Sequence, residues 1–168
     1  VCTILELNKQ LSDIYWLNIA DSGFPFGGII EHTNFISQEK YGGKHLAYLS
    51  RYFTHNDPLA KMEKEDIKKM MLEPLHRIYP GFDDSWLTDI HVFKTMTAAT
   101  VCDLNFSKKI VDCQLPVNGL YVANMQHIYP DERSVNNSIR IAAEACRVIG
   151  IPSDFVPKGV SLAGKIGF

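Results

Sequence analysis

The chain has 168 residues, of which 46% are hydrophobic and 21% are charged, a composition that excludes a disordered or collagen-like chain. Seventeen Lys and Arg against nineteen Asp and Glu give a net charge of −2, which argues against a non-specific nucleic-acid-binding protein. No apolar run approaches the roughly 20 residues that span a bilayer, and we expect no membrane span and no signal peptide.

The first 53 residues carry four segments rich in β-branched and aromatic residues. Residues 1–7 and 14–20 are predicted to form two strands of a hairpin, joined by the polar residues 8–13. Residues 29–36 predict a third strand and residues 44–53 a fourth. Both faces of the fourth segment carry apolar groups, so we expect this strand to be covered on both sides.

A helical segment follows. Asp57 and Pro58 form a helix start, and a second start lies near Glu63. Pro74 interrupts the helical spacing and predicts a break there. Residues 86–98 then predict a further strand.

The C-terminal part predicts a strand, a loop and a helix. Residues 120–124 read as a short buried strand, and Ser134 is the expected N-cap of a helix that ends at Gly150. Three- and four-residue spacing predicts one buried apolar stripe on this helix. Its members are Ile139, Ala142, Ala143, Cys146 and Ile149.

This element order predicts an α+β fold with a mostly antiparallel or mixed sheet, a helical insertion and a C-terminal strand–helix unit. We expect a substrate-binding-like domain over 1–116, a strand and helix over 117–150, and a weakly ordered tail over 151–168.

Motifs for several kinds of chemistry are missing from the sequence. There is no GxSxG, phosphate loop or GxGxxG, and the six histidines form no zinc-binding pattern. The four cysteines have no CxxC spacing, which favours reduced thiols in a cytoplasmic protein. No paired carboxylates stand out, so the catalytic residues stay unknown.

The helix start at Ser134 is the most informative feature for function. Free backbone amides at a helix N-terminus attract partial negative charge, such as a phosphate oxygen or a flavin carbonyl. An ordinary strand–loop–helix unit with a polar cap explains the same pattern.

Residues 119–145, GLYVANMQHIYPDERSVNNSIRIAAEA, resemble the C-terminal flavin-binding segment of FAD-dependent oxidoreductases of the amine oxidase and protoporphyrinogen oxidase superfamily. Residues 15–36 and 41–53, YWLNIADSGFPFGGIIEHTNFI and YGGKHLAYLSRYF, resemble the substrate-binding domain of the same group. Bacterial relatives of UDP-galactopyranose mutase in surface-polysaccharide biosynthesis are similar as well.

The resemblance implies FAD as cofactor in a longer protein. It puts the strand end at Asn124 and Met125, and the flavin-facing helix start at Ser134, Val135 and Asn136. Many relatives have Gly where Ser134 stands. The family also needs an N-terminal Rossmann FAD domain with a Gly-rich turn, which these residues lack. The chain is therefore expected to be a fragment that is inactive alone, to retain no FAD, and to self-associate through the face that meets the missing domain.

The candidate substrate-binding residues are Phe26, His32, Tyr48 and Arg51. Phenylalanines in the loop over residues 24–28 fit aromatic walls for a small-molecule substrate, and Arg51 fits an anionic group. An ordinary core loop, with Arg51 paired to a carboxylate, is the alternative. A non-catalytic ligand-binding or interaction module therefore stays open as a second class of function.

Overall fold

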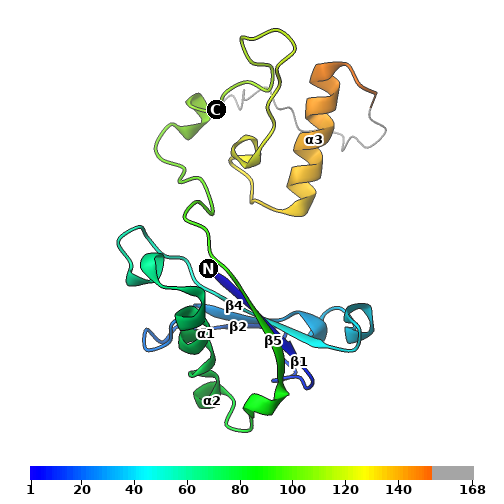
Figure 1. Cartoon of the computed structure of the whole chain (residues 1–168). Coiled ribbons are helices and arrows are strands. Elements are labelled where there is room, and N and C mark those ends of the chain that lie inside the picture. Colours follow the sequence, from blue (N-terminus) through cyan, green and yellow to red (C-terminus); the bar gives the residue numbers. More distant parts are fainter. Residues whose placement is uncertain (153–168) are drawn as a thin grey trace. The chain divides into compact units, whose positions relative to one another are not determined.

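The structure is a computed structural model that describes residues 1–152, and it divides into two compact units (Figure 1). The first unit is Val1–Ala98, and the second begins at Ala99. The expected boundary between residues 116 and 117 falls inside the second unit, and the expected tail lies, from residue 153 onward, outside the described residues.

The first unit is built on a five-stranded sheet in the order β2-β3-β4-β1-β5, with every pairing antiparallel. The strands are β1 (Cys2–Leu7), β2 (Trp16–Asn18), β3 (Gly28–Glu31), β4 (His45–Ser50) and β5 (Leu87–Phe93). The α+β fold predicted from the sequence is confirmed.

The predicted hairpin between residues 1–7 and 14–20 is wrong. β1 lies between β4 and β5, and β2 pairs with β3 instead. The buried carboxylate of Glu31 explains part of this difference, because it accepts hydrogen bonds from the amides of Leu11 and Ser12 at 2.9 and 3.1 Å. These bonds hold the connection against the end of β3, away from β1.

Two α-helices cover one face of the sheet. α1 (Lys64–Leu72) and α2 (Leu75–Ile78) are separated at Pro74, as the sequence predicts. The Asp57 side chain caps a 3-10 helix by accepting from Leu59 N, with Pro58 as its first residue. The 3-10 helices of this unit are His32–Asn34, Gln38–Tyr41, Pro58–Lys61 and Asp84–Trp86.

The covered face of the sheet forms the core. Leu5, Leu49, Ile67, Met71 and Leu75 are fully buried and belong to one apolar cluster. Such burial contributes roughly 1.5–3 kcal/mol for each large aliphatic side chain.

The opposite face of the sheet remains open to solvent in part. On β4, Ala47 and Leu49 are buried, whereas Leu46 and Tyr48 on the other side are only half-buried. The expectation that this strand is fully covered on both sides is therefore wrong. The helices α1 and α2 pack on one face alone, and the other face is only partly covered, by the 3-10 helices that carry His32 and Tyr41.

The predicted strands are shorter than expected: β2 covers only Trp16–Asn18, and β4 ends at Ser50. The segment over residues 29–36 leaves the sheet after Glu31 and continues as the 3-10 helix His32–Asn34. β5 ends at Phe93 rather than residue 98, and Lys94 Nζ donates to the carbonyls of Ala60 and Met62 at 3.1 and 2.6 Å. These bonds direct the chain away from the sheet.

The second unit contains the 3-10 helices Phe106–Lys108 and Met125–Ile128 and the longer helix α3 (Val135–Ile149). The buried strand predicted over residues 120–124 is wrong: a single bridge pairs Tyr121 with Gln114, and Leu120 is 48% exposed. The predicted helix ends are confirmed. Ser134 caps α3, and Gly150 ends it at φ 85°, a left-handed conformation that favours glycine.

The predicted apolar stripe of α3 is wrong in part: Ala143 is buried as expected and Cys146 is half-buried, but Ala142 is exposed. Ile139 and Ile149 are each 42% exposed, whereas Ile141 and Ala145 are buried. The helix packs against the 3-10 helix Met125–Ile128, and this neighbour selects the buried side. No helix in the described part of the chain is long and apolar enough to cross a membrane.

Candidate functional site

The residues predicted to bind substrate are divided by the sheet. Phe26 is 2% exposed and belongs to the core on the helical side, where its ring centroid lies 6.2 Å from that of Phe24. Arg51 follows β4 and lines a pocket on the same side. Tyr48 points to the open face, where its ring lies against His32. The four residues therefore do not form one site.

On the open face, aromatic side chains gather around His32. Its Nε2 lies 2.6 Å from the Tyr41 hydroxyl, and its ring centroid lies 5.8 Å from that of Tyr48 in an edge-on contact. Partial burial raises the pKa of the Tyr48 hydroxyl, so this group is a neutral donor at physiological pH. Ile4 and Ile30 flank Tyr48 on the neighbouring strands. This surface suits an apolar or planar ligand.

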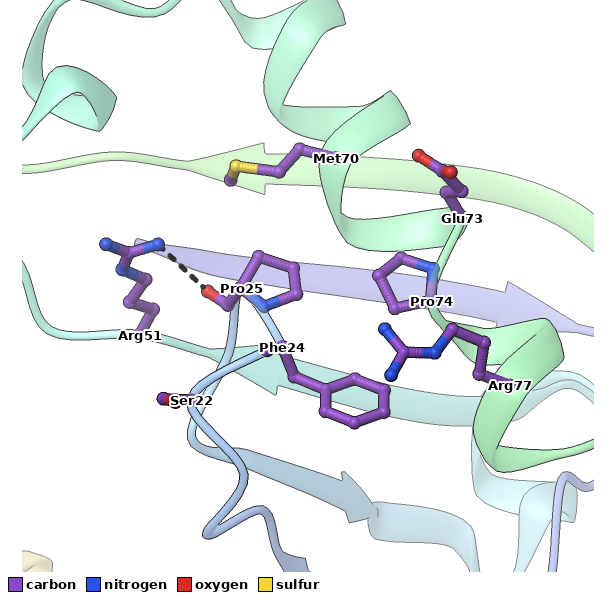
Figure 2. Close-up of a pocket in the computed structure, with 9 residues that line it drawn as sticks. Ser22, Phe24, Pro25, Arg51, Met70, Glu73, Pro74 and Arg77 are labelled. Carbon is purple, nitrogen blue, oxygen red and sulfur yellow. Dashed lines mark hydrogen bonds between the residues drawn. The ribbon is translucent and has the colours of Figure 1, made fainter.

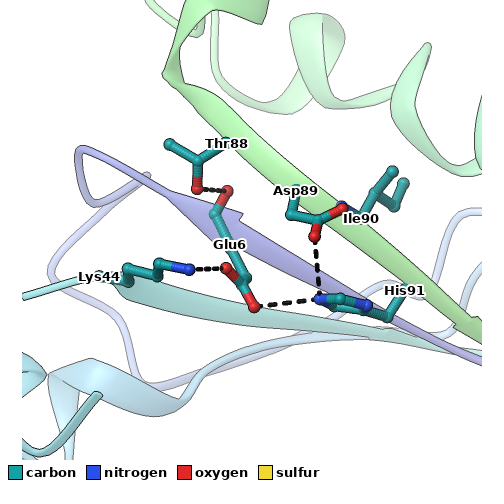
Figure 3. Close-up of polar contacts among 6 residues, drawn as sticks. All are labelled: Glu6, Lys44, Thr88, Asp89, Ile90 and His91. Atoms are coloured by element: carbon teal, nitrogen blue, oxygen red, sulfur yellow. Dashed lines mark hydrogen bonds and ion pairs between the residues drawn. The ribbon is translucent and has the colours of Figure 1, made fainter. Parts of the chain in front are cut away.

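The open face also carries a charged cluster that joins β1 and β5, together with Lys44 directly before β4 (Figure 3). Glu6 on β1 pairs with Lys44, and its Oε1 lies 3.0 Å from His91 Nε2. Asp89 Oδ2 lies 3.6 Å from the same nitrogen. Hydrogen bonds from Lys44 and then from His91 lower the pKa of Glu6, and Glu6 raises that of Lys44.

Glu6, Asp89 and His91 carry metal-ligand atoms within 4.8 Å of one another. Lys44 already neutralises Glu6, so the arrangement is a satisfied polar network. Sequence reasoning missed this cluster. Asp89 and His91 stand two apart on a strand and so share a face, but nothing local shows that β1 lies beside them.

On the helical side, a pocket of about 420 Å³ opens between the loop that follows β2 and the helices α1 and α2 (Figure 2). Its lining residues are Ser22, Gly23, Phe24, Pro25, Arg51, Met70, Glu73, Pro74 and Arg77. Of the candidate substrate-binding residues, only Arg51 lines it.

Arg51 is anchored by two contacts. Its Nη2 lies 2.6 Å from Asp57 Oδ2, and its Nη1 faces the Pro25 carbonyl at 3.5 Å. The Leu59 amide, with a further contribution from Arg51, lowers the pKa of Asp57. The carboxylate is thus ionised at neutral pH, and the guanidinium is held in one position.

In the second unit, the predicted flavin-contacting residues come together. Asn124 caps the 3-10 helix that begins at Met125. Ser138 Oγ, in the first turn of α3, lies 3.5 Å from Met125 Sδ and donates to the nearer Ser134 carbonyl at 2.9 Å. Ser134 Oγ accepts from the Asn137 amide at 3.2 Å, and the amides of Val135 and Asn136 have no intrahelical partner.

A buried histidine supports this arrangement. His127 is 8% exposed, and its Nε2 faces the Val111 carbonyl at 3.1 Å. Nε2 therefore carries the proton, and Nδ1 accepts from the Asn124 amide at 3.2 Å. Sequence reasoning missed this role of His127, although an Asn three residues before it is a capping signal.

Comparison with protein-family models, with curated proteins and with solved structures finds no match to the chain.

Proposed function

We propose that the chain is the substrate-binding part of an FAD-dependent oxidoreductase of the amine oxidase type, with a Rossmann FAD domain outside these 168 residues. The observation that carries the proposal is the juxtaposition in the second unit. Met125 and the first turn of α3, where the resemblance puts the flavin contacts, lie together, and both Met125 and Val135 are exposed.

The residues present fit a flavin at this place. Ser134 has φ −131°, an extended conformation that any residue adopts, so the backbone does not require the glycine of relatives. Its Oγ is occupied with the Asn137 amide. The amides of Val135 and Asn136 are therefore the groups that would donate to a pyrimidine carbonyl of the flavin.

In the proposed enzyme, the cofactor and this chain would have different roles. A bound FAD would accept a hydride from a substrate C–H bond. In this chain the open sheet face, with Trp16, Tyr48 and the His32–Tyr41 pair, supplies an aromatic wall that favours an apolar or planar substrate.

The experiment begins with the reading frame that contains these 168 residues. Its longest product is expressed, purified and examined for visible flavin absorbance, and we expect one FAD per polypeptide. The 168-residue chain alone is expected to lose FAD on gel filtration. A colourless full product that takes up no added FAD would contradict the proposal.

A charge substitution tests the contact itself. Asn136→Asp puts a negative charge at the proposed pyrimidine contact, so it should lower the reduction potential of bound flavin. Asn118→Asp, in an exposed turn, is the matched control. Equal reduction potentials of the flavin in the two variants would show that the first turn of α3 does not contact the flavin.

A further inference from the structure

We propose that the pocket between the Phe24 loop and helices α1 and α2 binds a small organic anion, a carboxylate or a phosphate monoester on an aromatic body. The proposal goes beyond the proposed function and does not depend on it. Phe24 and Met70 pack against the core on the helical side of the sheet, whereas Tyr48 and His32 lie on the open face.

Arg51 supplies an anchored cation at this pocket. The side chain of Arg51 is 33% exposed, and Asp57 holds it through a contact of 2.6 Å. Asp57 is itself held by the Leu59 amide at 2.9 Å. A guanidinium has more N–H donors than these contacts use, so Arg51 presents further donors at a fixed place. A ligand would not have to immobilise this side chain.

Arg77 supplies a second cation to the lining of the pocket. Its Cζ lies 4.4 Å from the centroid of the Phe24 ring. Within the described chain, no ion pair joins Arg77 to a carboxylate. A contact with an aromatic ring does not consume the N–H donors of a guanidinium, so Arg77 can still donate to an anion. Figure 2 shows Arg77 beside Phe24 at the pocket.

The pocket also has an apolar part in its lining. Phe24, Pro25, Met70 and Pro74 contribute carbon surface. A volume of about 420 Å³ fits a small molecule rather than a single ion. An aromatic body in contact with this surface, with its charged group at the arginines, would use both parts of the lining.

Glu73 limits the charge of the ligand. Two arginines line the pocket, but Asp57 neutralises Arg51 and Glu73 adds a carboxylate to the lining. A ligand with several carboxylates would meet repulsion from Glu73, so a single anionic group fits best.

The test uses the whole chain and calorimetric titration with benzoate and with phenyl phosphate. We expect saturable binding of at least one of them, and the tighter one identifies the anionic group. Benzyl alcohol, which lacks the charge, and inorganic phosphate, which lacks the aromatic body, should each bind on the order of tenfold more weakly. Equal binding of benzyl alcohol, or no saturable binding of either aromatic anion, overturns the proposal.

Two matched substitutions assign the binding to this pocket. Arg77→Gln keeps a polar side chain but removes the charge. It should lower the affinity for the aromatic anion on the order of tenfold. Arg133→Gln, an exposed arginine of the second unit, should leave affinity unchanged. Both tryptophans lie in the first unit, so Trp fluorescence on unfolding verifies that the Arg77→Gln pocket is intact. Equal affinity in the two folded variants also overturns the proposal.

Discussion

The two units of the chain achieve order in different ways. In the first unit, strands distant in sequence pair across a five-stranded sheet, and one apolar cluster is fully buried beneath it. In the second unit, order comes mainly from capped helices and short turns. Its buried apolar side chains are few, and those identified are Phe106, Cys113, Ile128, Ile141, Ala143 and Ala145.

This difference predicts where stability and function lie. The first unit has a core that supports rigid walls, including the pocket with Arg51 and the open face with Tyr48. The second unit presents exposed apolar groups beside the first turn of α3, among them Met125 and Val135. Exposed apolar surface beside free helix amides fits a segment that is completed by another domain or by a cofactor.

The largest effect is expected from a core truncation in the first unit. Leu49→Ala leaves a cavity under the sheet and should lower the free energy of unfolding by about 3–4 kcal/mol. Trp fluorescence in a urea titration measures it, because Trp16 and Trp86 both belong to this unit. Ile141→Ala in the second unit should leave that transition unchanged. A shift of similar size in both variants would mean that the units unfold together.

The next effect concerns the buried carboxylate of the first unit. Glu31→Ala removes the carboxylate that accepts from the amides of Leu11 and Ser12. It should lower the free energy of unfolding by about 2–3 kcal/mol. The same urea titration applies, with the exposed Glu39→Ala as control. Equal urea midpoints for Glu31→Ala and Glu39→Ala would show that water replaces the carboxylate and that other contacts hold the connection to β2.

A smaller effect is expected at the cap of α3. Ser134→Ala removes the acceptor for the Asn137 amide and should destabilise the helix by about 1 kcal/mol. Far-UV circular dichroism during thermal unfolding measures the loss. Ser134→Asp retains an acceptor and is the control. If both variants lose the same helicity, the cap contributes nothing.

The smallest effect depends on pH. The Leu59 amide and then Arg51 lower the pKa of Asp57 in the folded state, so the folded protein binds fewer protons there than the unfolded chain. The stabilisation is complete above the ordinary carboxyl pKa and is lost as pH falls through the lowered value. Asp57→Asn should therefore be less stable than the parent chain at neutral pH and equal to it in acid.

Urea titrations at both pH values measure this difference. Asp112→Asn, an exposed aspartate in the second unit, is the control and should show no such convergence. A constant difference between Asp57→Asn and the parent chain at both pH values would assign the effect to packing rather than to charge.

Local features of the sequence were sufficient to predict where several helices begin and end. Asp57 with Pro58, the break at Pro74 and the helix ends at Ser134 and Gly150 were all predicted, and the structure contains each one. Each depends on a side chain or backbone preference that acts within a few residues, which is why a single sequence reveals it.

Only the tertiary structure decided which distant segments meet. The pairing of β1 with β4 and β5 and the pocket that joins Phe24 to Arg77 depend on neighbours far apart in sequence. The buried side of α3 depends on how the helix packs against Met125–Ile128. An apolar residue indicates that it favours burial, but not which partner buries it. Ile139 and Ile141 show this limit: they are equally apolar and two positions apart on one helix, and packing buried only Ile141.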